Sequence, residues 1–141
     1  MAEEAIPDPP AGFVRSAGRG QFSTLNGPYF HRLGEGDTVE QAFFALPRHT
    51  NGIGLVHGGM LSAFTDGLLA SAVGRATGKV GVTIHLSIDY LHMGRVGDWV
   101  LGEARCTRLT RDVGFAEGRA HVRGVDVVRA SGIFKLMERH G

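Results

Sequence analysis

The residues from His49 to Thr77 constrain the fold of this chain more than any other segment. They begin as a polar, glycine-rich loop and continue after Gly58-Gly59 as a run that is apolar almost all the way round a helix. A helix of this composition is buried on every side rather than laid on a surface. Gly78 then provides the left-handed residue that often ends a helix. The sequence therefore predicts a long, buried helix between Gly58 and Gly78.

Asp66 is the one ionisable residue inside the apolar part of this helix. It lies too far from the helix start to cap it, and burying a lone carboxylate is costly unless something compensates its charge. A conflict of this kind between local rules and sequence often marks a functional residue. The alternative is a structural carboxylate that backbone or hydroxyl groups satisfy.

The remainder of the chain is dominated by strand-like segments. The clearest of them alternates Val82, Ile84, Leu86, Ile88 and Tyr90 with mostly polar residues, which is the period of two typical of a strand. Short turns join the segments that follow it, and strands joined in this way form an antiparallel meander. The predicted strands are Tyr29–Leu33, Thr38–Leu46, Val82–Tyr90, Trp99–Thr110, Val113–Val122 and Val127–Leu136.

Two of these strands carry a face of small residues, such as Gly102 and Ala104 in one and Gly114 and Ala116 in the other. Small side chains indicate close contact with another layer. The sheet needs a cover on one face, and the long helix is the only cover available. We therefore predict an α+β fold in which a curved antiparallel β-sheet wraps around one long central helix.

Composition indicates an ordinary globular domain: the chain has 141 residues, of which 43% are hydrophobic and 21% charged. A net charge of +1 gives no reason to expect a nucleic-acid or membrane surface. The single Cys106 excludes a disulfide within the chain, and its strand-like context favours a packed residue over a catalytic thiol.

We expect residues 1–12, which are acidic and proline-rich, to form a flexible tail, and residues 13–141 to form a single domain. The segment 13–26 is ambiguous and can hold a short helix or a lid over a pocket. Because the start of the chain resembles neither a signal peptide nor a spanning helix, we expect a cytoplasmic protein.

The loop and the helix together carry the pattern H-x-N-x-x-G-x-x-H-G-G…D, formed by His49, Asn51, Gly54, His57, Gly58, Gly59 and Asp66. This pattern resembles the signature of hotdog-fold acyl-CoA thioesterases, with the closest likeness to the branch of the phenylacetate-pathway thioesterase. The resemblance is dense from His49 to Asp66 and continues more loosely to about Leu136. It implies the hotdog fold and a site that uses neither a metal nor a cofactor.

The resemblance also implies roles for four catalytic residues. Asp66 would act as general base or nucleophile, a choice that the sequence leaves open. The N–H of Gly58 would stabilise the oxyanion at the helix start, although this glycine could simply let the chain enter the helix. Asn51 would orient the attacking water or the carbonyl, or would be an ordinary turn residue. Thr83 stands where relatives carry a Ser or Thr near the carboxylate, or is an exposed strand hydroxyl.

Further residues are expected around these four. His57 and Gly59 are candidates for substrate binding, and His49 for fixing the loop. The acyl pocket is expected to draw on Phe22, Leu25, Phe64 and Tyr90. The sequence has no G-x-S-x-G elbow, no H-E-x-x-H or Cys-His cluster, no P-loop and no dinucleotide fingerprint.

The spacing of Gly58 and Asp66 predicts a homodimer. Eight residues on one helix span roughly 12 Å, yet both groups must approach the same thioester carbon or its water within about 3–4 Å. Two antiparallel copies of the helix that cross near Ser62 would place Gly58 of one copy opposite Asp66 of the other. We expect a homodimer with shared active sites, and the sequence leaves open a dimer of dimers, that is, a homotetramer.

These observations predict a thioesterase that hydrolyses an aryl- or medium-chain acyl-CoA, with acyl-CoA as its substrate partner. A hotdog hydratase or dehydratase is one alternative, disfavoured by the N-x-x-G-x-x-H-G-G run. A non-catalytic acyl-CoA-sensing module is the other, disfavoured because Asn51, Gly58 and Asp66 are all present.

Overall fold

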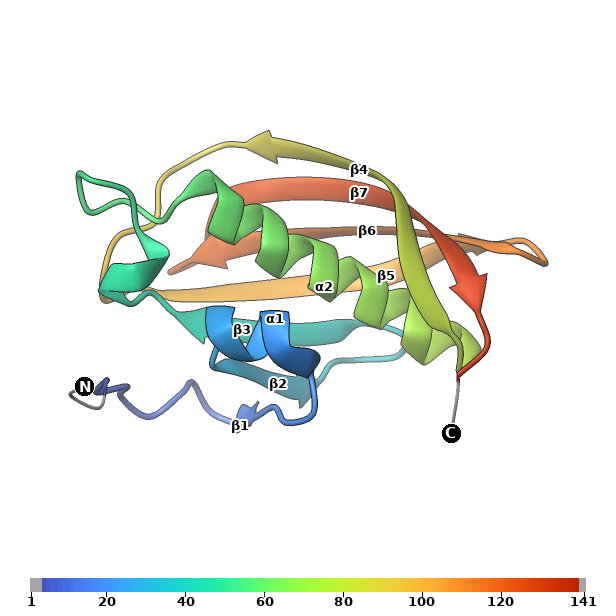
Figure 1. Ribbon diagram of the computed structural model, residues 1–141, viewed down its shortest axis with the longest axis horizontal. Helices are drawn as coiled ribbons and strands as arrows, with labels where there is room; N and C mark the ends of the chain where they lie inside the picture. Colours follow the sequence, from blue (N-terminus) through green and yellow to red (C-terminus); the bar gives the residue numbers. More distant parts are fainter. Residues whose placement is uncertain (1–3, 140–141) are drawn as a thin grey trace.

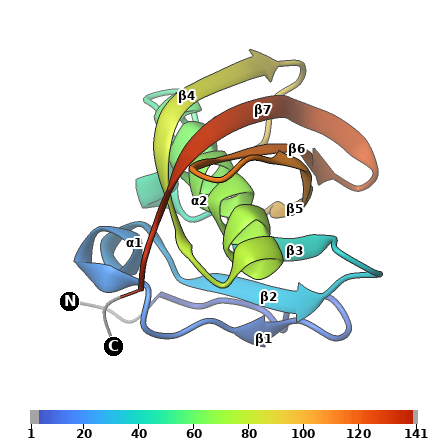
Figure 2. The ribbon, with the colours of Figure 1, turned by 90° about the vertical axis from the view of Figure 1, so that its right-hand side faces the viewer.

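A long helix, α2 (Gly58–Thr77), runs through the centre of a curved seven-stranded sheet in the computed structural model, which describes residues 4–139 (Figures 1 and 2). This is the predicted arrangement of one antiparallel sheet wrapped around one helix, and it confirms the hotdog fold. The helix ends where expected: Gly78 has a φ of 71°, and its N–H donates to the Gly74 carbonyl at 2.8 Å.

The sheet has the strand order β1-β2-β3-β5-β6-β7-β4, and every neighbouring pair is antiparallel. The predicted meander is present as β5, β6 and β7. Strand β4 precedes them in the chain but lies beyond β7, with which it pairs, at the edge of the sheet. The strands are β1 (Val14–Arg15), β2 (Tyr29–Leu33), β3 (Val39–Phe44), β4 (Val80–Tyr90), β5 (Trp99–Leu109), β6 (Val113–Val122) and β7 (Val125–Met137). Two short helices, α1 (Gly20–Asn26) and the 3₁₀ turn η1 (Pro47–His49), flank β2 and β3.

The small residues of β5 and β6 let the sheet approach α2 closely, as predicted. A Cβ on Gly102 would lie 2.7 Å from Cδ2 of Leu68, and a Cβ on Gly114 would lie 2.8 Å from Cγ1 of Val73. Both distances are shorter than real carbon contacts, so a larger residue at either position would force the core side chains of α2 to shift. The core between sheet and helix therefore depends on small residues in the strands and large ones on the helix.

One face of α2 differs from the prediction of a helix buried on every side. Met60, Phe64, Leu68 and their neighbours on the sheet side are buried. The sheet curves round only that side, so the remaining face is half-buried within a single chain (Figure 2). In the middle of α2 the half-buried residues are Ser62, Ala63, Asp66, Gly67, Ala70 and Ser71.

The N-terminal segment lies along the other end of the sheet. Ile6 packs against a small cluster that includes Phe13 and Phe30, on the face of the sheet away from α2. The predicted flexible tail, residues 1–12, falls partly on residues 1–3, which lie outside the described residues, and for residues 4–12 its flexibility stays a prediction.

The segment that the sequence left open, residues 13–26, contains β1 and α1. None of the α1 residues is buried. Two neighbours hold the end of this helix: Arg48 donates to the carbonyls of Leu25 and Gly27, and His49 Nε2 donates to the carbonyl of Asn26. The expectation of a short helix is confirmed, and the role of a lid stays a prediction.

Candidate active site

Asp66 and Thr83 meet at the half-buried face of α2. Thr83 Oγ1, in β4, donates a hydrogen bond to Asp66 Oδ1 at 2.6 Å. Among the described residues, Oδ2 of Asp66 has no hydrogen-bond partner. The carboxylate is therefore held by one oxygen, and its other oxygen is available to a substrate or a water molecule.

An irregularity in β4 gives Thr83 this orientation. Leu86 and Ile88 pack against the core around α2, and in an uninterrupted strand Thr83 would point to the opposite face from both. The pairing of β4 with β7 shifts register between Thr83 and His85. A bulge of this kind turns the strand so that Thr83 also faces the helix. The strict alternation expected from the sequence is thus wrong at this point.

His57 organises the start of α2. It is the N-cap residue, and its Nδ1 accepts a hydrogen bond from the Gly59 N–H at 2.7 Å. A Cβ on Gly59 would lie 2.9 Å from that same Nδ1, so a larger residue here would push the His57 ring out of its capping position. Within the described residues the N–H of Gly58 has no acceptor. The first turn therefore offers the Gly58 amide, and not the Gly59 amide, to a ligand.

Tyr90 and Ser62 lie beside Gly58. A Cβ on Gly58 would lie 3.6 Å from Cε1 of Tyr90, an ordinary contact, so the packing of this chain does not require glycine at position 58. The Tyr90 hydroxyl lies 2.5 Å from Oγ of Ser62, which itself donates to the Gly58 carbonyl at 2.9 Å. From the sequence, Tyr90 was expected only to line the acyl pocket, and no contact between Tyr90 and Ser62 was predicted.

Asn51 shapes the loop that precedes α2. Its Oδ1 accepts hydrogen bonds from the N–H groups of Ile53 at 3.0 Å and Leu55 at 3.1 Å. These two bonds use the carbonyl of the side chain and leave its amide Nδ2 as the group that can act on a ligand. In this chain Asn51 lies in the loop before α2, whereas Asp66 lies in the third turn of the helix.

His49 fixes the start of the loop that precedes α2, as expected. Its Nδ1 accepts from the Leu46 N–H at 3.1 Å, and its Nε2 donates to the Asn26 carbonyl at 2.6 Å. The ring is buried against Phe43, and this burial lowers the pKa of His49 below its ordinary value of 6.5. The neutral imidazole therefore ties η1 to the end of α1.

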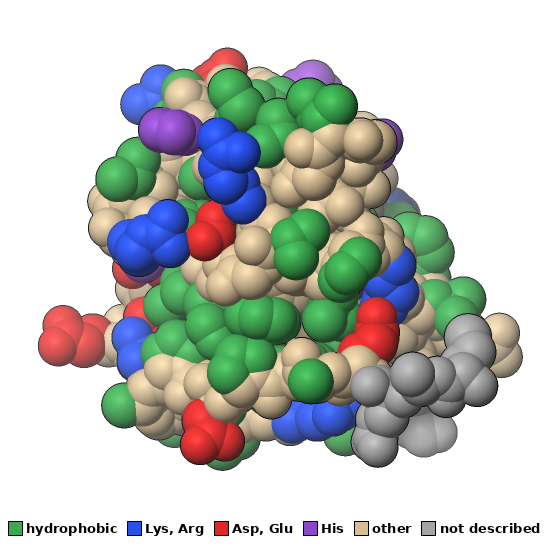
Figure 3. Space-filling view, turned by 90° about the vertical axis from the view of Figure 1, so that its left-hand side faces the viewer, with side chains coloured by type: hydrophobic (Ala, Val, Ile, Leu, Met, Phe, Trp, Pro, Cys, Tyr) green, Lys and Arg blue, Asp and Glu red, His purple; other side chains and the backbone are tan. Residues whose placement is uncertain are grey.

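The residues expected to line an acyl pocket lie apart from one another. Phe64 is 1% exposed in the core, whereas Phe22 and Leu25 are 71% and 76% exposed on α1. Figure 3 shows the end of the molecule that lies on the left in Figure 1. On this end, hydrophobic side chains gather on the surface around the loop before α2 and the loop after β4. Exposed ones in these two loops are Ile53, Leu91, Met93 and Val96.

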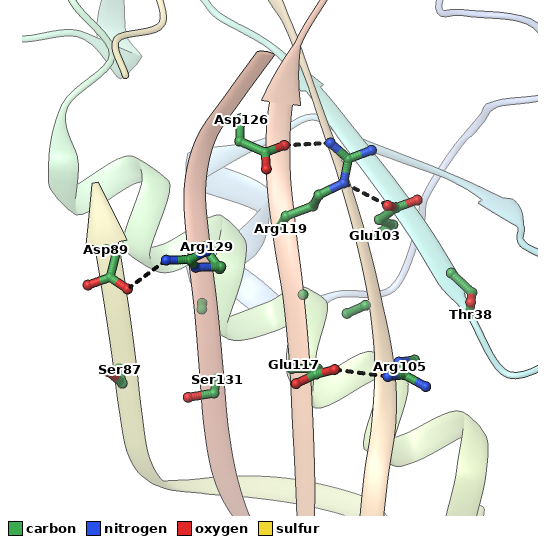
Figure 4. A pocket seen from close by; sticks show the side chains of 13 residues that line it. Thr38, Ser87, Asp89, Glu103, Arg105, Glu117, Arg119, Asp126, Arg129 and Ser131 are labelled. Atoms are coloured by element: carbon green, nitrogen blue, oxygen red, sulfur yellow. Dashed lines mark hydrogen bonds and ion pairs between the residues drawn. The ribbon is translucent and has the colours of Figure 1, made fainter. Parts of the chain in front are cut away.

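A groove of about 520 Å³ on the outer face of the sheet is separate from these residues (Figure 4). Its charged side chains are already paired with one another, as Arg119 is with Glu103 at 2.7 Å and Arg105 is with Glu117 at 3.0 Å. Because α2 lies on the other face of the sheet, this groove has no access to Asp66. It is not the candidate active site.

No described helix is long and apolar enough to cross a membrane. Across residues 4–139, no three His, Cys, Asp or Glu side chains gather in a way that could hold a metal ion. Cys106 is a partly buried residue packed against the core, in agreement with the packed role expected for it.

Comparison with known proteins places these features in a family. The model of the thioesterase superfamily matches residues 53–128. PA0474, a suspected esterase of Pseudomonas aeruginosa, is 36% identical over 132 residues, which cover 90% of this chain and 96% of that protein.

Two solved structures share the fold. A suspected thioesterase of Ralstonia eutropha JMP134, related to phenylacetic acid degradation, has a TM-score of 0.72 at 25% identity, over 81% of this chain and 88% of that one. A hypothetical thioesterase of Streptococcus pneumoniae TIGR4, solved with coenzyme A, has a TM-score of 0.73 at 22% identity, over 80% of this chain and 88% of that one. The chain belongs to the thioesterase superfamily and is a thioester hydrolase, an acyl-CoA thioesterase.

Proposed function

We propose that this enzyme hydrolyses an aryl- or medium-chain acyl-CoA to the free acid and coenzyme A, at active sites shared between the two subunits of a homodimer. The observation that carries the proposal is the Asp66 carboxylate, held by Thr83 on the face of α2 that the chain's own sheet leaves half-buried. The coenzyme A bound to the Streptococcus pneumoniae neighbour supports an acyl-CoA substrate.

Asp66 is the group that starts the reaction. With Oδ1 fixed by Thr83, its free Oδ2 can take a proton from a water molecule while the water oxygen attacks the thioester carbon. The C–S bond then breaks, and the proton passes to the departing sulfur, which leaves as coenzyme A thiol. Alternatively, Oδ2 attacks the carbon itself, and the C–S bond breaks so that coenzyme A leaves as the thiolate. Water then hydrolyses the resulting anhydride, which restores the Asp66 carboxylate and releases the acid, whose proton passes to the thiolate. Both routes require the same free carboxylate oxygen.

Gly58 stabilises the charge that develops on the carbonyl oxygen. Its N–H lies at the positive end of α2 and lacks an acceptor within the described residues, while the neighbouring Gly59 N–H is bonded to His57. Gly59 and His57 thus contribute to substrate binding by shaping the turn that presents the Gly58 amide. Asn51 donates from Nδ2 to the attacking water or to the thioester carbonyl.

These groups can act together only between two chains. Gly58 and Asp66 are separated by roughly 12 Å along α2, at 1.5 Å per residue. If two α2 helices cross antiparallel near Ser62, Gly58 of one subunit lies opposite Asp66 of the other. The face available for such a crossing is the half-buried one, and its Ser62 and Ala63 are small enough for close approach.

The edge of the sheet supports the same dimer. Strand β4 has 11 residues and lies at the edge of the sheet, where it exposes Val80, Val82 and Ile84. A long, apolar edge strand is prone to pair with another chain. Pairing of β4 with the β4 of a second copy would cover these residues next to the α2 crossing. Association of two such dimers is not required to complete a site.

The experiment that tests the proposal is a panel of acyl-CoA thioesters assayed with a reagent for free thiols. Aryl and medium-chain acyl-CoAs should release coenzyme A faster than acetyl-CoA by about tenfold or more in kcat/KM. Binding of acyl-CoA without thiol release would instead identify a sensing module and overturn the proposal.

A further inference from the structure

A second groove runs along α2 next to the position of Asp66, although Asp66 itself is not among its lining residues. It measures about 660 Å³ and lies between the segment Ser16–Ser23, strands β2 and β3, the second half of α2 and the start of β4. Gly67, which follows Asp66, and Ala70, one helical turn beyond Asp66, both line it. Space next to the reacting carboxylate is where the acyl group of a thioester would extend.

The charged residues that line this groove all have the same sign. They are Arg19, Arg75, Lys79 and Arg139, and no Asp or Glu is among the lining residues. Two of them are engaged elsewhere: Arg75 donates to the Thr38 and Gly36 carbonyls, and Lys79 pairs with Glu138 at 3.4 Å. The groove therefore presents an excess of positive charge.

Arg19 is the cation of this groove that lies against Gly67, the residue after Asp66. Its Nη2 would lie 3.0 Å from a Cβ on Gly67, and its guanidinium lies 4.6 Å from the ring centroid of Tyr29. Within residues 4–139 no carboxylate pairs with it. Burial lowers the pKa of Arg19, which shows that the cation is partly removed from water. A desolvated guanidinium without a carboxylate favours an anionic ligand.

Gln41 makes the floor of the groove polar. It is 5% exposed, and its Nε2 donates to Oγ of Ser71 at 2.7 Å, while Ser71 donates to the Gly67 carbonyl. This chain of donors fixes the amide orientation and leaves Oε1 of Gln41 without a partner. A purely apolar acyl end would leave the Arg19 guanidinium without an anion, whereas a carboxylate would pair with it.

From these contacts we infer that the preferred acyl group carries a carboxylate at its distal end, held by Arg19 in the groove beside Gly67. The inference rests on the proposed function and narrows its substrate class to acyl-CoAs with an anionic acyl end. The reacting carbonyl lies at Asp66, and the distal carboxylate lies a few bonds further along α2. Arg19 binds the substrate and takes no part in proton transfer.

The test compares substrates of equal chain length with and without the carboxylate, namely glutaryl-CoA against pentanoyl-CoA and adipoyl-CoA against hexanoyl-CoA. For the parent enzyme, kcat/KM should be higher for the carboxylated member by about tenfold or more. Arg19→Gln should reduce this ratio by about tenfold or more, and Arg19→Lys should restore part of it. Arg111→Gln removes one exposed cation in the distant β5–β6 turn and should keep the parent ratio.

A second variant, Gln41→Glu, is needed in case Arg19→Gln does not fold. Arg19→Gln removes the stacking of the guanidinium on Tyr29, whereas Gln41→Glu keeps it. It puts a carboxylate into the groove with little change in shape and should also reduce the preference by about tenfold or more. A parent enzyme that prefers the neutral substrates would overturn the inference and leave the proposed function intact. An equal loss on both members of a pair in Arg19→Gln would mean that the cation holds coenzyme A phosphates, and would also overturn it. Absence of hydrolysis for all four substrates would overturn the inference, and absence of hydrolysis for the aryl-acyl-CoAs as well would refute the proposed function.

Discussion

Thr83 Oγ1 donates to Asp66 Oδ1 at 2.6 Å and so joins the edge strand β4 to the central helix α2 at the centre of the candidate active site. The bond depends on the register shift of β4 between Thr83 and His85. It fixes one oxygen of the carboxylate and directs the other toward the half-buried face of the helix. This relationship determines what each residue of the site is expected to do.

Asp66→Asn should fold and bind acyl-CoA, while turnover falls by about 10²–10⁴-fold. The amide keeps the shape of the side chain, and Thr83 can still donate to its oxygen, but the group can no longer accept a proton or attack the thioester. Thiol release measures the turnover, and circular dichroism checks the fold. Turnover within about tenfold of the parent enzyme would remove Asp66 from the role of base or nucleophile.

Thr83→Ala should lower turnover modestly, by about 3- to 30-fold, because the carboxylate loses one orienting hydrogen bond. Since the side chain of Thr83 is exposed in the single chain, the free energy of unfolding should change by less than about 1 kcal/mol. Thr83→Ser keeps the hydroxyl and serves as the matched control, with turnover close to that of the parent. An unfolded Thr83→Ala variant would show that the residue is structural.

Substitution by alanine should affect catalysis at Gly58 and stability at the neighbouring Gly59. Gly58→Ala should fold, because its Cβ would lie 3.6 Å from Tyr90, and should lose about 10- to 100-fold in kcat/KM because the methyl group crowds the amide offered to the substrate. Gly59→Ala should destabilise the chain by about 1–2 kcal/mol, because its Cβ would displace His57 from the helix cap. Thermal unfolding and thiol release on both variants separate the two effects. Equal loss of stability in both variants would contradict the assignment.

Stability should fall as the solution becomes acidic, and His49 should account for part of this fall. The pKa of His49 is lowered in the folded chain because the ring is buried, so the unfolded chain binds the proton first as pH decreases. The stabilisation is therefore fully present above the unfolded pKa of about 6.5 and is lost as pH falls toward the lower folded value.

Urea unfolding at pH 7.5 and pH 5.5 measures the effect, with His49→Gln as the comparison. The parent should lose more stability than the variant between the two pH values. Burial lowers the pKa of His121 in the same direction, but its contribution is common to both proteins and cancels in the comparison. The same pH dependence in both proteins would show that His49 does not titrate as the structure indicates.

Sequence reasoning predicted the elements that depend on local pattern. The apolar run before Gly78 and the alternation in β4 are local signals, and both elements form where expected. The pairing of β4 with β7 involves residues about 50 positions apart. The bulge near Thr83 arises from that pairing, which no local pattern encodes.

Some residues of the candidate site were predicted from the sequence, and others were not. The resemblance to the thioesterases implied roles for Asp66 and Thr83, which the structure brings into contact. It also assigned the oxyanion N–H to Gly58 rather than to Gly59, but the physical reason, that His57 Nδ1 already accepts from the Gly59 N–H, is visible only in the structure. The sequence did not predict a role for Arg19. This residue reaches Gly67 only through the fold of the segment 13–26, whose structure the sequence left open.

The shared site is the central claim, and subunit exchange tests it most directly. Asn51→Ala and Asp66→Asn are prepared separately, shown to be nearly inactive as homodimers, and then unfolded and refolded together. If Asn51 and Gly58 act with Asp66 of the partner subunit, each mixed dimer contains one intact site and one doubly defective site. Random pairing makes half of the dimers mixed, so about a quarter of all sites, and of the parent activity, should return. A mixture that stays inactive, although mixed dimers are shown to form, would contradict the shared site.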